Sequence, residues 1–184
     1  AVMIFIASAH HEEIAAQLEA LGYVEGENYT NAFATLDNRH VLPLWESDAA
    51  FGALYDDVKK HTLLGKKRVY MLYQLARQAL ALPGDLAEAG VYRGGSSLLL
   101  CQLAKQRGKV VHMFDTFAGM PGTDASIDQH QAGEFADTSV EAVGALVAPT
   151  GSGQLHPGFF PDSACGLEAT KYCFVHVDMD IYRS

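Results

Sequence analysis

The stretch from Glu88 to Ser96 combines an acidic residue with three glycines, a combination suited to holding a ligand close to the backbone. It reads Glu-Ala-Gly-Val-Tyr-Arg-Gly-Gly-Ser and lies between an apolar run and a helical pattern. Glycine permits a tight turn and lets a ligand approach the main chain, because no Cβ stands in the way. The N–H groups at the start of the following helix favour a negatively charged group. We therefore expect a cofactor-binding turn at this position.

A second acidic residue, Asp115, ends the next apolar run. A carboxylate at the tip of a strand beside such a turn is placed to accept hydrogen bonds from both hydroxyls of a ribose. In dinucleotide enzymes the turn has the spacing Gly-x-Gly-x-x-Gly and holds a pyrophosphate. The spacing in this chain is Glu-x-Gly-x-x-x-Gly, which favours a ligand that ends in a carboxylate, such as the methionine part of S-adenosylmethionine.

A third acidic residue, Asp178, ends the apolar run over 172–178, and Asp180 follows it. Carboxylate oxygens are the ligands that a hard cation such as Mg²⁺ prefers. We predict that Asp178 is a metal ligand in the intact protein and that Asp180 or a nearby lid residue assists proton removal. A single carboxylate with waters makes a poor Mg²⁺ site, so other acidic residues are needed to complete it.

The elements expected to position these residues alternate between strand and helix. Alternation of this kind predicts an α/β fold, a Rossmann-like doubly wound parallel sheet that is truncated after its fourth core strand. We expect the strands at 109–115 and 172–178 to lie on opposite sides of the strand at 85–90. The expected order is strand 85–90, helix 96–106, strand 109–115, helix 139–146, strand 154–156 and strand 172–178.

Two further regions precede this core, which is expected to occupy residues 83–184. Residues 1–40 are expected to form a β-α arm, with a strand over 2–8 and a helix after it, followed by a linker. Residues 25–45 contain Gly26, Asn28, Asn31, Asn38 and Pro43, so we expect irregular structure there. Residues 41–82 show helical periodicity and predict a helical region. Both ends of the chain suggest a piece of a longer protein.

Composition argues against several classes of partner. The formal charge is −9 and basic residues form no stripe, which is atypical of proteins that bind nucleic acids. No apolar stretch approaches the roughly 20 residues that a membrane span requires. The three cysteines show no Cys-x-x-Cys spacing, and we expect reduced thiols in a cytoplasmic protein.

The segment after Pro121 allows two interpretations. It carries Asp128, His130 and Glu134 without a regular pattern, and loops of this length are often functional. One interpretation is a solvated loop. The other is a lid over an acceptor site, with His130 as a general base.

Four segments, in order, resemble the macrocin O-methyltransferase family, whose members methylate sugar hydroxyls on macrolide and aminocoumarin antibiotics. The helical pattern over 51–80 also resembles the region that precedes the core in that family, so the resemblance covers about residues 45–184. The four segments are 83–97, 114–121, 157–163 and 177–184.

The resemblance implies a class I methyltransferase fold and a role for each candidate residue. It implies that Asp115 holds the ribose, and that Asp178 lies beside the transferred methyl group and binds a divalent ion. The family's next strand, which carries an acidic pair that completes the metal site, has no counterpart in these residues. The other cofactor-binding residues implied are Glu88, Gly90, Gly94 and Gly95 in the turn, Tyr92 and Ser96 near the methionine end, Thr116 and Phe117 beside the ribose, and Phe159 and Phe160 beside the adenine.

The expected function is therefore an S-adenosylmethionine-dependent O-methyltransferase, assisted by Mg²⁺, that acts on a hydroxyl of a sugar or another small molecule. Two alternatives stay open. One is a non-catalytic methyltransferase-fold module of a larger biosynthetic protein, and the other is a nicotinamide-dependent Rossmann enzyme. The expected partner is a small molecule rather than nucleic acid or membrane, and a homo-oligomer is left open.

Overall fold

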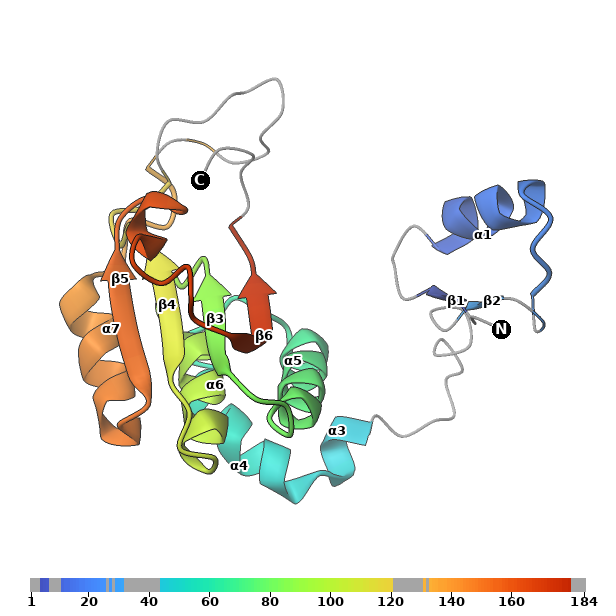
Figure 1. Ribbon diagram of the computed structural model, residues 1–184. Coiled ribbons are helices and arrows are strands. Elements are labelled where there is room, and N and C mark those ends of the chain that lie inside the picture. The colour runs from blue at the N-terminus through green and yellow to red at the C-terminus, as the bar shows by residue number, and fades with distance from the viewer. Residues whose placement is uncertain are drawn as a thin grey trace. The chain divides into compact units, whose positions relative to one another are not determined.

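The computed structural model describes residues 4–6, 11–25, 27, 29–31, 44–120, 131 and 133–179. Contacts along the chain divide it into two compact units, Ala1–Glu46 and Ser47–Ser184. The predicted helical region and the predicted core thus share one unit almost entirely. Figure 1 labels the elements of both units.

The first unit contains a small parallel β-α-β arrangement. Strand β1 (Ile4–Ile6) pairs with β2 (Tyr29–Asn31), and helix α1 (His11–Ala20) lies between them in the sequence. The expectation of irregular structure throughout 25–45 is wrong at β2. A lone strand leaves its backbone N–H and C=O groups unpaired, and β2 supplies partners for those of β1. Tyr29 is fully buried, and its hydroxyl donates a hydrogen bond to Glu19 of α1.

Helices α3 (Leu44–Ser47), α4 (Ala49–Val58) and α5 (Lys66–Ala79) precede the sheet of the second unit. The Asp48 side chain accepts a hydrogen bond from the N–H of Phe51 and so caps α4. Phe51 is fully buried and contacts the rings of Tyr55, Tyr70 and Tyr73, which joins α4 to α5. Helices α4 and α5 pack on the sheet through α6.

The sheet of the second unit has four parallel strands in the order β5-β4-β3-β6. Figure 1 shows the arrows of these four strands pointing the same way. The strands expected at 109–115 and 172–178 do flank the strand at 85–90 on opposite sides, in parallel, so this prediction is confirmed. The strands are β3 (Asp85–Ala89), β4 (Val111–Asp115), β5 (Gly153–Pro157) and β6 (Tyr172–Val177).

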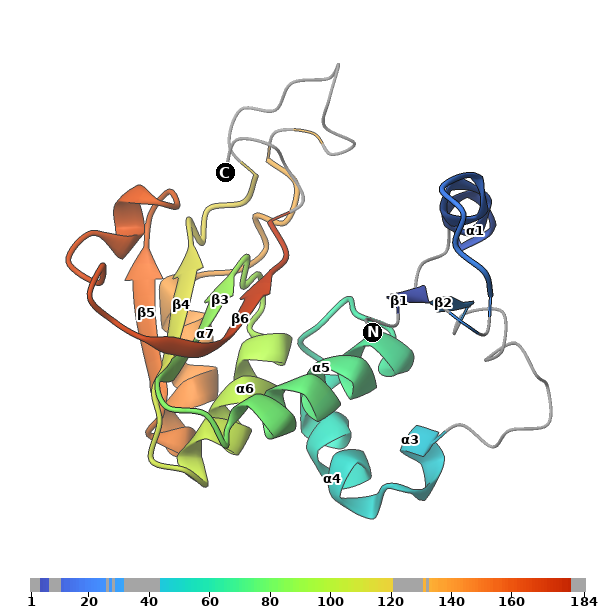
Figure 2. The ribbon, with the colours of Figure 1, turned by 45° about the vertical axis from the view of Figure 1, so that its right-hand side comes forward.

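Helices cover one face of this sheet. Helix α6 (Gly95–Lys105) packs on β3 and β4, and α7 (Val140–Val147) packs on β5. Figure 2 shows α5, α6 and α7 on the same side of the strands. Two short 3-10 turns complete the described elements, Ala148–Thr150 before β5 and Asp162–Ala164 before β6.

The opposite face of the sheet is covered near its centre by the connection between β5 and β6. Ala87, Ala89 and Phe114 form a buried cluster there, and Leu167 and Met179 pack against it. Val175 and Val177 of β6 remain more than half exposed.

No described helix is long and apolar enough to span a membrane. Because the strands are parallel, the carboxyl ends of β3, β4 and β6 lie together along one edge of the sheet.

Candidate functional site

The turn after β3 is closed by two glycines that have no room for a side chain. Gly90 has a φ of +88°, and a Cβ there would lie 2.1 Å from the carbonyl oxygen of Asp178. A Cβ on Gly95 would lie 2.6 Å from the backbone of His61. Glycine at both positions therefore lets the tip of β6 and the α4–α5 connection approach the turn. The N–H of Gly95 donates to the carbonyl of His61 at 3.0 Å and fixes this approach.

Asp115 ties the tip of β4 to this turn. One carboxylate oxygen accepts hydrogen bonds from the N–H groups of Val91, at 2.7 Å, and Tyr92, at 3.0 Å. The other oxygen accepts from the N–H of Phe117 at 2.8 Å. A carboxylate oxygen has further acceptor capacity beyond these bonds, and Asp115 also lines a pocket. The residue both supports the turn and faces the space beside it.

Glu88 lies beneath the turn and is fully buried. Its carboxylate accepts hydrogen bonds from the hydroxyl of Ser97 and from Nδ1 of His176, the latter at 2.8 Å. Burial alone lowers the pKa of His176, but the hydrogen bond and charge of Glu88, together with Asp178, outweigh burial and raise it. Glu88 thereby connects β3, α6 and β6, which positions the turn from below.

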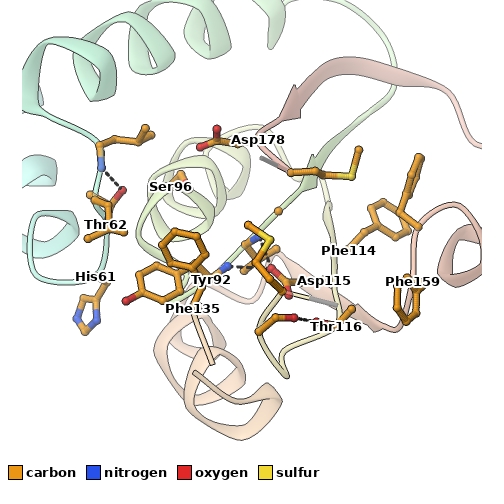
Figure 3. Close-up of a pocket in the computed structure, with 18 of the residues that line it drawn as sticks. His61, Thr62, Tyr92, Ser96, Phe114, Asp115, Thr116, Phe135, Phe159 and Asp178 are labelled. Carbon is orange, nitrogen blue, oxygen red and sulfur yellow. Dashed lines mark hydrogen bonds between the residues drawn. The ribbon is translucent and has the colours of Figure 1, made fainter. Parts of the chain in front are cut away.

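The pocket runs along the carboxyl ends of the strands, and Figure 3 shows its residues. Thr62 lies at one end, Phe114 and Phe159 lie at the other, and Asp115 lies between them. The lining comes from the α4–α5 connection (61–64), the turn after β3 (90–92 and Ser96), the end of β4 (114–116, Gly119 and Met120), Phe135, the loop after β5 (158–160), and Asp178 with Met179 at the tip of β6.

One end of the pocket is aromatic. The rings of Phe114 and Phe160 meet edge to face with centroids 5.7 Å apart. Phe159 is half exposed and Phe160 about one-third exposed. A planar heterocycle can stack on surfaces of this kind.

A second aromatic pair, Tyr92 and Phe135, lies near the middle of the pocket, with ring centroids 5.4 Å apart. The segment that carries Phe135 is held to the turn by an ion pair between Arg93 and Asp137, and by a hydrogen bond from the Thr138 hydroxyl to the carbonyl of Tyr92. The hydrogen bond from Tyr92 and the pairing with Arg93 lower the pKa of Asp137. These contacts thus hold the segment whose Phe135 lines the pocket.

The structure brings most of the predicted site residues together. Glu88, Gly94, Gly95 and Phe117 lie outside the pocket lining, where the first three shape the turn and Phe117 is buried beside Asp115. Asp180, Asp128 and His130 lie outside the described residues. Those that line the pocket are Gly90, Tyr92, Ser96, Asp115, Thr116, Phe159, Phe160 and Asp178.

Sequence reasoning missed two groups of pocket residues. The first is the α4–α5 connection, where Thr62 accepts a hydrogen bond from the N–H of Leu64. Thr62 and Gly65, which lie between two helical patterns, indicated a loop only weakly. The second is Phe135, an aromatic residue with a φ of +59° in a loop. A positive φ cannot be read from the sequence of a phenylalanine.

The described residues do not make up a metal site. Among them, no group of three or more His, Cys, Asp or Glu side chains lies close enough to hold a metal ion. Asp178 alone offers too few oxygen ligands for Mg²⁺. The described residues alone therefore do not complete a site for the ion that the resemblance implies.

The chain is similar to known O-methyltransferases. The 8-demethyl-8-(2,3-dimethoxy-α-L-rhamnosyl)-tetracenomycin-C 4'-O-methyltransferase of Streptomyces olivaceus matches over 140 residues at 31% identity. The mycinamicin III 3''-O-methyltransferase of Micromonospora griseorubida matches over 140 residues at 29% identity. The demethyldecarbamoylnovobiocin O-methyltransferase of Streptomyces niveus matches over 140 residues at 26% identity. The matches cover 66–67% of this chain and 53–55% of the relatives. The chain thus spans about half the length of the curated relatives it matches.

Solved structures show the same fold. The O-methyltransferase NovP has a TM-score of 0.55 at 24% identity, over 66% of this chain and 57% of its own. The calicheamicin methyltransferase CalS11 has a TM-score of 0.55 at 16% identity, over 74% of this chain and 70% of its own. These likenesses confirm the Rossmann-like methyltransferase fold. Residues 52–184 match the macrocin-O-methyltransferase (TylF) family, and the chain belongs to that family.

Proposed function

We propose that the pocket binds S-adenosylmethionine and that the protein containing this chain transfers its methyl group to a hydroxyl of a small molecule. The observation that carries the proposal is the position of Asp115. Its carboxylate lies at the tip of β4, bonded to the turn after β3, and lines the pocket between an aromatic end and the start of α6. An aromatic surface followed by a carboxylate that accepts from ribose hydroxyls suits an adenosyl group.

The two ends of the pocket support one orientation of the ligand. Phe159 and Phe160 offer stacking surfaces for the adenine, beside Phe114. At the other end Ser96 lies in the first turn of α6, and Thr62 lines the pocket nearby. The positive end of the helix dipole favours the methionine carboxylate there.

When bound, S-adenosylmethionine supplies an electrophilic methyl group. The acceptor oxygen forms a bond to the methyl carbon as the sulfur–carbon bond breaks, and the hydroxyl proton passes to a base. Asp178 lines the pocket at the tip of β6 and offers a carboxylate beside the expected position of the sulfonium. Asp178 and Asp180 are the proposed catalytic residues. Assistance by Mg²⁺ stays a prediction that rests on the resemblance, and no step is assigned to it.

The acceptor is proposed to be a sugar or another natural-product hydroxyl. The named relatives are O-methyltransferases of tetracenomycin, mycinamicin and novobiocin precursors. Phe135 lines the pocket and contacts Tyr92, and we propose that the acceptor binds on this side. The net charge of −9 favours an uncharged small molecule over nucleic acid.

A methyl-transfer assay with the intact protein tests this proposal. With methyl-labelled S-adenosylmethionine and a panel of rhamnosides, we expect label in a rhamnoside with a free hydroxyl and none in its fully methylated counterpart. Asp178→Asn is expected to slow the transfer, and a parallel reaction with EDTA tests metal assistance. Binding of the cofactor without transfer to any hydroxyl acceptor would favour the non-catalytic module instead.

A further inference from the structure

Two histidines on neighbouring strands form a hydrogen-bonded pair beneath the aromatic end of the pocket. Nδ1 of His112, on β4, lies 3.0 Å from Nε2 of His156, on β5. The two rings stack with centroids 5.2 Å apart and planes 20° apart. His112 is 5% exposed. Because side chains alternate along a strand, His112 shares a face of the sheet with Phe114.

The groups around the pair come from every strand of the sheet. On β3, Asp85 Oδ2 lies 3.8 Å from Nε2 of His112. On β6, the Tyr172 ring meets His112 edge to face at 5.6 Å. Burial and the charge of Asp85 raise the pKa of Tyr172, so its phenol stays neutral. Asp85 thus lies on the Nε2 side of His112, and His156 lies on its Nδ1 side.

A hydrogen bond between two imidazoles requires one N–H and one lone pair. While this hydrogen bond is kept, the pair can therefore take up at most one proton beyond the two that the neutral rings carry. A second proton would place two N–H groups and two positive charges face to face, which would drive the rings apart. Burial, followed by the charge of His112, lowers the pKa of His156, in agreement with this limit.

The pair is in direct contact with the pocket wall. The His156 ring stacks on Phe114 with centroids 4.8 Å apart and planes 19° apart, and Phe114 contacts Phe160. His156 also closely precedes the loop of Phe159 and Phe160. In that loop the N–H of Gly158 donates to the carbonyl of Asp115 at 2.9 Å. Movement of His156 would displace both the aromatic surface and the loop that carries it.

We propose that His112 and His156 are positioning residues for the adenine end of the pocket. Their hydrogen bond holds Phe114 and the 158–160 loop in place only while the pair carries no second proton. The inference rests on the proposed function, because it requires that the adenine binds at this end. It follows that cofactor affinity falls in acid through a pair of groups that do not touch the cofactor.

The direction of the pH effect follows from linkage. The neutral form of His156 is the form that the folded, binding-competent state favours, and its pKa there is below the usual value. The resulting stabilisation is complete above the unfolded pKa of about 6.5 and is lost as the pH falls below it. Affinity is therefore expected to be constant above neutrality and to fall as the pair takes up its second proton.

Calorimetric titrations at about pH 7.5 and about pH 5.5 test the inference, since the two values bracket the histidine range. The ligands are S-adenosylhomocysteine and adenosine. For each ligand and each protein, the readout is the dissociation constant at the lower pH divided by that at the higher pH. The wild-type ratio is expected to lie clearly above about twofold and to reach at most roughly tenfold, the loss over one pH unit below a controlling pKa. His156→Phe keeps a flat ring against Phe114 but cannot titrate, so its ratio is expected to stay below about twofold, within the scatter of such titrations.

Glu141→Gln is the matched control, because Glu141 is an exposed titratable group of α7 that lies outside the pocket lining and outside the pair. It is expected to keep the wild-type ratio. An equal acid loss in His156→Phe and wild type would overturn the inference, as would a wild-type ratio near one. Absence of S-adenosylhomocysteine binding at the higher pH would instead overturn the proposed function.

A spectroscopic measurement covers the case in which His156→Phe does not fold. In long-range ¹H–¹⁵N spectra of the wild-type protein, we expect the His112 and His156 ring nitrogens to report one shared N–H at neutral pH. Its loss on acidification should coincide with changes at Phe114. Two rings that titrate independently, each with both nitrogens in solvent-like states, would overturn the inference.

Discussion

Replacing Asp115 with alanine is expected to weaken S-adenosylhomocysteine binding by about 1.5–3 kcal/mol, the range for hydrogen bonds to a charged group, or roughly 10- to 150-fold. Two losses combine in this effect. The ligand loses the acceptor for its ribose hydroxyls, and the N–H groups of Val91, Tyr92 and Phe117 lose the carboxylate that holds them. Calorimetric titration of the variant gives the change in affinity directly.

Two further variants separate these losses. Asp115→Asn keeps one acceptor oxygen but turns an N–H donor toward either the turn or Phe117, so we expect an intermediate affinity. Asp162→Ala removes an exposed carboxylate outside the pocket lining, and we expect it to bind as wild type does. Thermal melting of each protein reports how far the turn itself is weakened. Unchanged affinity in Asp115→Ala would rule out the ribose assignment.

Replacing Gly90 with alanine is expected to give the largest loss of folding stability at the site. A Cβ at this position would lie 2.1 Å from the Asp178 carbonyl oxygen and 2.6 Å from its carbon, and neither backbone atom can move aside as a flexible side chain can. The left-handed backbone adds about 1–2 kcal/mol and the overpacking about 1–3 kcal/mol, so the total is roughly 2–5 kcal/mol. Chemical denaturation measures this change in the free energy of unfolding.

Gly151→Ala is the matched control for Gly90→Ala. Gly151 has a φ of +67°, but a Cβ there would meet no atom within 4 Å. We therefore expect only the backbone cost of about 1–2 kcal/mol. An equal loss in the two variants would show that the close approach of β6 to the turn contributes nothing, and it would remove the steric requirement for glycine at position 90.

The arrangement of the sheet could be predicted because it depends on local patterns. Apolar runs ending at Asp115 and Asp178, with helical patterns between them, predicted the strands at 85–89, 111–115 and 172–177, and the order of doubly wound sheets then placed them side by side. The acidic tips then fall along one edge, since parallel strands end together. The short strand Tyr29–Asn31 was missed because three residues among Asn and Gly carry no periodicity of their own.

The parts of the site that were missed depend on contacts between distant segments. Thr62 reaches the pocket because Gly95 admits the His61 backbone, a contact that neither segment signals alone. Phe135 reaches it through the pairing of Arg93 with Asp137. Glu88 was predicted in the turn, but its hydrogen bonds with Ser97 and His176 join segments that are distant in the sequence. The His112–His156 pair requires the register between β4 and β5, which the sequence does not specify.

Calorimetric titration of the chain with S-adenosylhomocysteine, and separately with NAD⁺ at the same concentration, tests the central claim most directly. The geometry of the pocket predicts that one S-adenosylhomocysteine binds per chain and that NAD⁺ gives no saturable heat. The reason is that the Glu-x-Gly-x-x-x-Gly turn and Asp115 suit a ribose followed by a methionine carboxylate, not a pyrophosphate. Tighter binding of NAD⁺ than of S-adenosylhomocysteine would contradict the proposed function.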